Sequence, residues 1–273
     1  MYNEAMGELT ARLTDALAEG QNIIAQDRLD HVMLGLRFGL MSRATAVGIL
    51  ADSPPARAAM YDCVRAMCEA VAQVTWITAS PVEMLSRSGC IELGQAKADA
   101  NNRRKLLAVH KVPRISEENR GSMLERLKDS DETVDRVRAQ HGKDCPNCHG
   151  KGRDAGHAAA WIHECAIRGD ATTAQVNLYS IWVGCSAEAH QLTPQRHSRE
   201  DGNHLDLPDE LADQAVAWAM ELLLSAAPLI AFAVRMSALE PTREVLRWWS
   251  EVLLSSLPWL RAAVTTSRTP ASP

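Results

Sequence analysis

Two cysteines with the spacing of metal ligands lie near the middle of the chain. Cys145 and Cys148 are separated by two residues within the segment Cys-Pro-Asn-Cys-His-Gly-Lys-Gly. Two thiolates on one tight turn can bind the same ion, and the glycines permit such a turn. A tetrahedral zinc site requires four ligands. Candidates for the other two lie in the same region of the sequence: His141, His149, His157, His163 and Cys165.

The density of these residue types favours a metal site. His163 and Cys165 extend the pair to Cys-x2-Cys-x14-His-x-Cys. Three of the seven cysteines and four of the nine histidines fall within residues 141–165. The segment also resembles one repeat of the zinc-binding Cys-x2-Cys-x-Gly-x-Gly pattern of DnaJ-type chaperones. Those proteins use several repeats, so the resemblance implies zinc but not chaperone activity. We therefore expect a structural zinc ion that pins this segment.

Three alternatives to zinc remain open for this segment. The first is a set of unligated thiols in a loop. The second is a c-type haem attachment through Cys-x2-Cys-His, which requires an exported chain. The third is a thioredoxin-like redox pair, which requires a βαβ unit that the sequence pattern lacks.

A second candidate site consists of polar residues on helices that are otherwise apolar. Arg65 and Glu69 lie four residues apart on one predicted helix, and Tyr179, Ser186 and His190 share one face of another. A phenol, a hydroxyl and an imidazole on one face form either a buried hydrogen-bond network or a small active site. In the active-site reading, His190 acts as the base and Tyr179 or Arg65 stabilises developing charge.

Basic residues followed by a histidine form a third candidate. Arg104 precedes His110 with five residues between them, directly after Asn101-Asn102-Arg103. In one interpretation, Arg103 and Arg104 hold a phosphate group while His110 transfers a proton. In the other, these are basic residues that favour the carboxyl end of a helix.

The second group carries a resemblance to a known class. Arg-x3-Glu on an early apolar helix, followed by a late helix with Tyr-x6-Ser-x3-His, resembles a group of helical bacterial proteins similar to HEPN bundles. Many HEPN proteins are ribonucleases with an Arg-x4–6-His motif near a dimer interface. The resemblance implies that RNA or a nucleotide is bound and that the chain forms a homodimer. No arginine lies in the four to six residues before His190, whereas Arg104 and His110 have that spacing.

The elements that must position these residues are predicted to be helices. Ala, Leu, Met, Glu, Gln and Arg dominate the sequence, whereas only two Phe and three Tyr occur. No long run alternates apolar and polar residues. We expect an all-α multi-helix bundle of about seven to nine helices with an inserted Cys/His-rich loop. The predicted helices cover residues 1–19, 27–50, 55–78, 81–110, 117–140, a segment that begins near 158, 172–190, 208–236 and 241–265.

These elements define the predicted domains. Residues 1–140 and 171–265 form one bundle, 141–170 are the inserted loop and possible zinc site, and 266–273 are a disordered tail. The stretch 222–234 is apolar but too short to span a bilayer, so we expect no membrane association. The polar amino terminus lacks the pattern of a signal peptide, which indicates a cytoplasmic protein with reduced cysteines.

The net charge excludes fewer functional classes than the motifs do. With 29 basic and 34 acidic residues, the chain lacks the basic balance of a protein held mainly by phosphate charge. Two functional classes remain, and the sequence leaves open whether the protein is an enzyme. The first, implied by the resemblance, is a HEPN-like ribonuclease or other nucleic-acid-acting protein of a toxin or phage-defence kind, with a structural zinc site. The second is a non-catalytic interaction or scaffold protein with a zinc-pinned loop.

Overall fold

The protein is built from helices, as the sequence predicted. The computed structural model describes residues 2–19, 28–53, 56–109, 116–141, 145–153, 155–168, 173–189, 209–233 and 244. Within these ranges it contains eight α-helices, one short 3-10 helix and no strand. The all-α prediction is therefore confirmed. The helix predicted over 241–265, apart from Glu244, and the tail predicted over 266–273 lie outside the described residues.

Most helix boundaries fall close to the predicted ones. The helix predicted from residue 55 is α-helical only from Ala59, and the one predicted from 81 opens with a 3-10 turn. The elements in chain order are α1 (Tyr2–Glu19), α2 (Arg28–Ala51), α3 (Ala59–Thr78), η2 (Pro81–Glu83), α4 (Met84–Val109), α5 (Glu117–His141), α6 (Ala155–Arg168), α7 (Thr173–Ala189) and α9 (Asp209–Ala233).

The helices belong to two compact units. The bundle unit comprises Met1–Thr75 and Ala159–Pro273, and the hairpin unit comprises Trp76–Ala158. The Cys-x2-Cys segment therefore belongs with α4 and α5, which precede it in the chain. Most of α6, including His163 and Cys165, belongs to the bundle unit.

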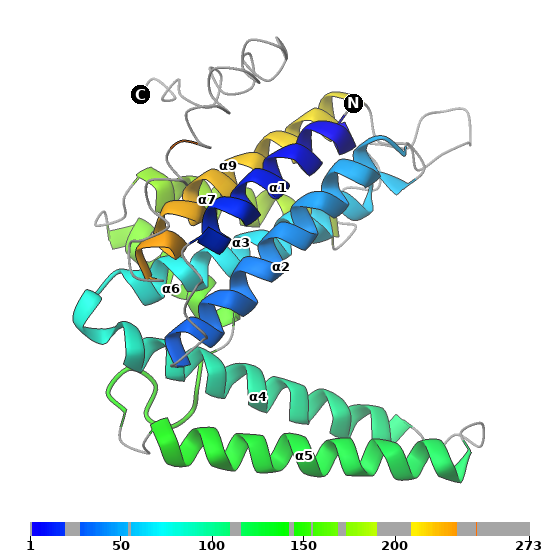
Figure 1. Cartoon of the computed structure of the whole chain (residues 1–273), viewed down its shortest axis with the longest axis vertical. Coiled ribbons are helices and arrows are strands. Elements are labelled where there is room, and N and C mark those ends of the chain that lie inside the picture. Colours follow the sequence, from blue (N-terminus) through cyan, green and yellow to red (C-terminus); the bar gives the residue numbers. More distant parts are fainter. Residues whose placement is uncertain are drawn as a thin grey trace. The chain divides into compact units, whose positions relative to one another are not determined.

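Helices α1, α2 and α9 run side by side in the bundle unit (Figure 1). Their packing follows from apolar residues at helical spacing. Met6, Leu9 and Leu13 of α1 recur every three or four residues and are fully buried. Helix α3 joins α9 through Tyr61, whose ring meets Trp218 edge to face with centroids 6.3 Å apart.

Two of these helices are apolar enough to be considered as membrane spans. The segments His31–Ala51 of α2 and Glu210–Ala233 of α9 have the length and composition to cross a bilayer. The apolar segment of α9, Glu210–Ala233, is thus longer than the apolar stretch 222–234 that was identified in the sequence. A core helix passes the same test, and more than half of the α9 segment is buried within the protein. The apolarity of α9 is accounted for by its packing against α1, α2 and α7.

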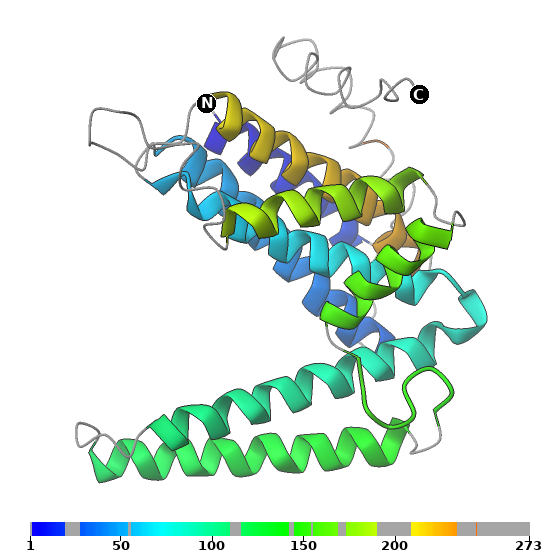
Figure 2. The same ribbon diagram turned by 180° about the vertical axis from the view of Figure 1, so that it is seen from behind.

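The hairpin unit is centred on α4 and α5, which lie antiparallel along their length (Figures 1 and 2). Helix α5 begins with an amino-terminal cap, in which the Ser116 hydroxyl accepts a hydrogen bond from the backbone N–H of Asn119 at 3.3 Å. The core between the two helices is small. It consists of Leu93, Ala96, Ala100, Val134 and Val137.

The rest of α5 is largely exposed, as its many charges predicted. Only three of its residues are buried: Ser130, Val134 and Val137. Burial between two helices of this length is therefore slight, and the hairpin needs another source of stability.

Candidate metal centre

Four metal-ligating side chains gather at one end of the helical hairpin. Cys90 comes from the first third of α4, His141 is the last residue of α5, and Cys145 and Cys148 lie on the turn that follows. Their four ligand atoms all lie within 4.8 Å of one another. The chain in Figure 2 passes from the end of α5 through this turn and back along the start of α4.

Three of the six separations between ligand atoms lie close to the edges of a tetrahedron around one ion, and the other three are at most 4.8 Å. Cys90 Sγ lies 3.6 Å from Cys145 Sγ and 3.3 Å from His141 Nε2. His141 Nε2 lies 3.3 Å from Cys148 Sγ. Tetrahedral zinc, with its usual bond lengths, separates two sulfurs by about 3.8 Å and a sulfur from a nitrogen by about 3.6 Å. The three thiols and the imidazole can therefore bind a common ion with only small shifts.

The turn itself is shaped by backbone hydrogen bonds. The carbonyl of Cys145 accepts from the N–H groups of Cys148 at 3.3 Å and His149 at 2.7 Å. His149 and Gly150 then adopt positive φ values of 50° and 68°. Glycine accepts that conformation without strain, which explains the residue type at position 150. The turn brings both sulfurs to the same side.

A close approach of two glycines fixes the segment against α4. Gly152 has a φ of 76°, and a side chain there would place its Cβ 2.5 Å from the backbone nitrogen of Gly94. A methyl group on Gly94 would likewise overlap the carbonyl of Arg153. Next to this contact, the N–H of Arg153 donates to the carbonyl of Cys90 at 2.7 Å. The backbone of the segment after the turn is thus in direct contact with α4, the helix that carries Cys90.

Polar side chains support the ligands from outside. The Ser86 hydroxyl lies 3.5 Å from Cys145 Sγ and accepts a hydrogen bond from the Asn147 side-chain amide at 3.3 Å. The Lys97 ammonium donates to the carbonyls of Gly150 at 3.0 Å and Lys151 at 2.8 Å. Such outer contacts orient metal ligands and hold the loop in place when a metal is bound.

Two arginines clamp the buried Trp76 beside the loop. The guanidinium carbons of Arg87 and Arg153 lie 5.3 Å and 5.0 Å from the Trp76 ring centre. Arg153 also donates through Nε to the carbonyl of Asn147 at 2.9 Å. Because both arginines contact one aromatic ring, they join the turn to the start of the hairpin unit through cation–π contacts.

The thiols differ in their electrostatic surroundings. Burial and the neighbouring thiols of Cys148 and Cys145 raise the pKa of the Cys90 thiol well above its ordinary value. Burial also acts to raise the pKa of Cys145, but hydrogen bonds from Ser86 and from the backbone N–H of Asn147 outweigh it, and the pKa is lowered. Metal thiolates require deprotonated sulfur, and this turn is built to stabilise a negative charge on Cys145.

Part of this ligand set was predicted from the sequence. The structure brings Cys145 and Cys148 together and completes the group with Cys90 and His141. The exposed His149 contributes no atom to the group. The predicted ligands His163 and Cys165 lie on α6 in the bundle unit, where the His163 ring stacks on Tyr179 with centroids 4.5 Å apart.

Sequence spacing singled out the turn but gave no means to find Cys90. It lies 55 residues before Cys145 on a predicted helix, where a lone cysteine is most often a buried core residue. His141 was one of several histidines near the cysteine pair that the sequence alone could not distinguish as ligands. Only the antiparallel pairing of α4 with α5 brings Cys90 close to the end of α5.

The residues of the second predicted site lie in the bundle unit. Arg65 Nε lies 3.5 Å from Glu69, and the Arg65 guanidinium carbon lies 6.0 Å from the Trp182 ring centre. Trp182 in turn stacks with Tyr179 at 6.4 Å. The Ser186 hydroxyl is buried and has no hydrogen-bond partner among the described residues. His190 lies outside the described residues.

The third predicted group is described only in part. Arg104 forms an ion pair with Asp131 across the hairpin and donates to the Asn101 side chain at 3.1 Å. His110 lies outside the described residues. Within the described part, the Arg104 side chain thus links α4 to α5.

No known protein family, curated protein sequence or solved structure matches the chain. The argument for function therefore rests on the chemistry of the residues described above.

Proposed function

We propose that Cys90, His141, Cys145 and Cys148 bind one zinc ion, and that the protein is a helical scaffold whose α4–α5 hairpin is fixed by that metal. The observation that carries the proposal is the convergence of all four ligand atoms within 4.8 Å. Three thiolates and one imidazole are a preferred ligand set of structural zinc. Softer thiolate ligands select against magnesium and calcium, which prefer oxygen.

A structural role fits better than a catalytic one. A catalytic zinc ion has three protein ligands and an open position for water or substrate, whereas this group offers four. The ligands are also shielded from solvent, since Cys90 is fully buried and Cys145 and Cys148 are each 6% exposed. With His141 partly exposed, the ion would be largely but not completely enclosed by protein.

The role follows from where the ligands lie. One ligand is on α4, one ends α5 and two are on the connecting turn, so one ion ties three segments of the hairpin unit together. Zinc supplies folding free energy to small units that bury little apolar surface. The exposed charged faces of α4 and α5 beyond the site are then available, on a rigid support, for a partner.

The metal content of the purified full-length protein tests the proposal. We expect about one zinc ion per chain by mass spectrometry of protein purified without added metal. The Cys145→Ser/Cys148→Ser double variant should contain none. A metal-free wild-type protein with all seven thiols titratable would rule out the site.

A second candidate is a HEPN-like nucleic-acid-acting protein. The favouring observation is that residues of the Arg-x3-Glu and Tyr-x6-Ser-x3-His motifs meet around one aromatic ring. Arg65 of α3 lies over Trp182 of α7, and Trp182 stacks with Tyr179. The imidazole of His163 covers Tyr179, so a cation, a phenol and an imidazole are gathered in one unit.

If this second function is correct, His190→Ala will lower RNA cleavage by about a hundredfold or more, because loss of a general base has that effect. Cleavage of a labelled single-stranded RNA measures it, with circular dichroism to verify the fold. His31→Ala is the matched control, because His31 is exposed on α2 in the same unit. Cleavage by the His190 variant at the wild-type rate would remove this residue from any mechanism.

A further inference from the structure

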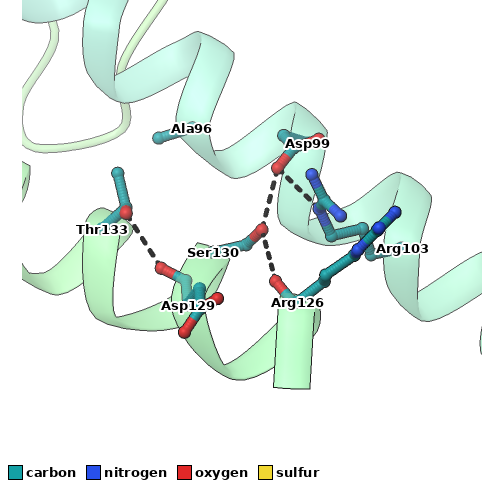
Figure 3. Close-up of a pocket in the computed structure, with 7 residues that line it drawn as sticks. All are labelled: Ala96, Asp99, Arg103, Arg126, Asp129, Ser130 and Thr133. Carbon is teal, nitrogen blue, oxygen red and sulfur yellow. Dashed lines mark hydrogen bonds and ion pairs between the residues drawn. The ribbon is translucent and has the colours of Figure 1, made fainter. Parts of the chain in front are cut away.

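A pocket lies between α4 and α5, and none of the four metal ligands lines it. It has a volume of about 400 Å³, and six of its seven lining residues are polar. Figure 3 shows its lining side chains, contributed by α4 on one side and α5 on the other. Neither the zinc proposal nor the predicted catalytic residues account for it.

One wall of the pocket is an arginine held in a fixed direction. Arg103 donates through Nε to Asp99 at 2.8 Å, and Asp99 also accepts from the hydroxyl of the buried Ser130 at 2.8 Å. The hydrogen bonds from Arg103 and Ser130 lower the pKa of Asp99, so its carboxylate stays ionised. Arg103 uses Nε for this ion pair, and its two terminal nitrogens donate to no other residue in the described part of the chain.

A second arginine approaches from the opposite helix. Arg126 of α5 forms no ion pair with any residue in the described part of the chain. Arg126 and Arg103 line the same pocket, one from each helix, together with Asp99 and Asp129 (Figure 3). Of the two guanidinium groups, only that of Arg103 is paired with a carboxylate in the described part of the chain.

Both guanidinium groups therefore keep unused hydrogen-bond donors within the described part of the chain. Arg126 is exposed, so packing does not fix its position. A phosphate group offers several oxygens and accepts paired hydrogen bonds from guanidinium groups. The Ser130 hydroxyl and Asp99 then act as the support that keeps Arg103 in place.

We propose that the α4–α5 pocket binds a phosphate group between Arg103 and Arg126. The shared chemistry is that of a phosphate ester, presented by a free nucleotide or by the backbone of single-stranded RNA. This inference goes beyond the zinc proposal, which concerns a different part of the hairpin unit. It shares Arg103 with the predicted phosphate group of Arg103, Arg104 and His110, but it combines that arginine with Arg126 of the opposite helix.

Binding of defined probes to the zinc-containing full-length protein tests this assignment. The probes are inorganic phosphate and ATP, followed by calorimetry, and a fluorescent single-stranded RNA, followed by anisotropy. Arg126→Gln should weaken binding about tenfold or more, since it removes charge-assisted hydrogen bonds to the phosphate group. The exposed Arg136→Gln on the same helix removes one charge outside the pocket and is the control.

The outcomes separate the sources of the phosphate group. Binding of ATP that Arg126→Gln weakens identifies a nucleotide site, and RNA binding alone with the same loss identifies the nucleic-acid backbone. Equal weakening by Arg126→Gln and Arg136→Gln would mean general charge attraction and would overturn the pocket. Absence of binding of all three probes at millimolar concentration would also overturn it. Zinc measured on the same samples shows whether the metal proposal stands separately.

Discussion

Replacing Cys90 by serine will abolish stoichiometric zinc binding and lower the free energy of unfolding of the hairpin unit by about 3 kcal/mol or more. Cys90 is the one ligand on α4, so its loss leaves the ion attached only to the end of α5 and the following turn. The core between α4 and α5 consists of five small or medium-sized apolar side chains and cannot compensate. The amides of both helices should then exchange with solvent far faster.

Hydrogen exchange followed by mass spectrometry, with and without a zinc chelator, measures the effect helix by helix. The wild type with chelator should behave like Cys90→Ser without it. Cys165→Ser is an informative control, because the sequence predicted Cys165 as a ligand while the structure has it on α6. Retention of zinc by Cys90→Ser together with its loss from Cys165→Ser would favour the sequence-predicted ligands and refute the structural set.

The helices were predictable because each carries its own signals. Met6, Leu9 and Leu13 recur at helical spacing, and Ser116 begins α5 as an amino-terminal cap; both features are local in sequence. The Cys-x2-Cys turn was predictable for the same reason, because its two thiols and its glycines lie within a few residues.

The rest of the metal centre depends on pairing between distant segments. Cys90 becomes a ligand only because α4 and α5 pair in one register, and no local pattern encodes that register. The histidines were ambiguous for a related reason. His141, His149 and His163 all lie within 15 residues of the cysteine pair. Of these three, only His141, which ends α5, joins the thiols, whereas His163 stacks on Tyr179.

Substituting alanine for Gly152 will separate the metal-binding loop from α4 and weaken zinc binding about a hundredfold. Two effects destabilise an alanine at position 152. A φ of 76° is unfavourable for any residue with a Cβ, by about 1 kcal/mol or more. The new Cβ would also lie 2.5 Å from the backbone nitrogen of Gly94, which cannot move because it is part of a helix. The hydrogen bond from Arg153 to the carbonyl of Cys90 would be strained at the same time.

Competition with a chromophoric chelator gives the zinc affinity, and thermal unfolding of the zinc-loaded protein gives the stability. Gly94→Ala should have a similar effect, because its methyl group would overlap the Arg153 carbonyl from the other side of the same contact. Gly121→Ala is the matched control on α5, since a Cβ there meets no atom within 4 Å and alanine favours a helix. Unchanged zinc affinity in both Gly152→Ala and Gly94→Ala would show that the loop does not need this contact with α4 to hold the ion. Loss of affinity in those two variants, with none in Gly121→Ala, would show that the backbone approach to α4 positions Cys145 and Cys148 opposite Cys90.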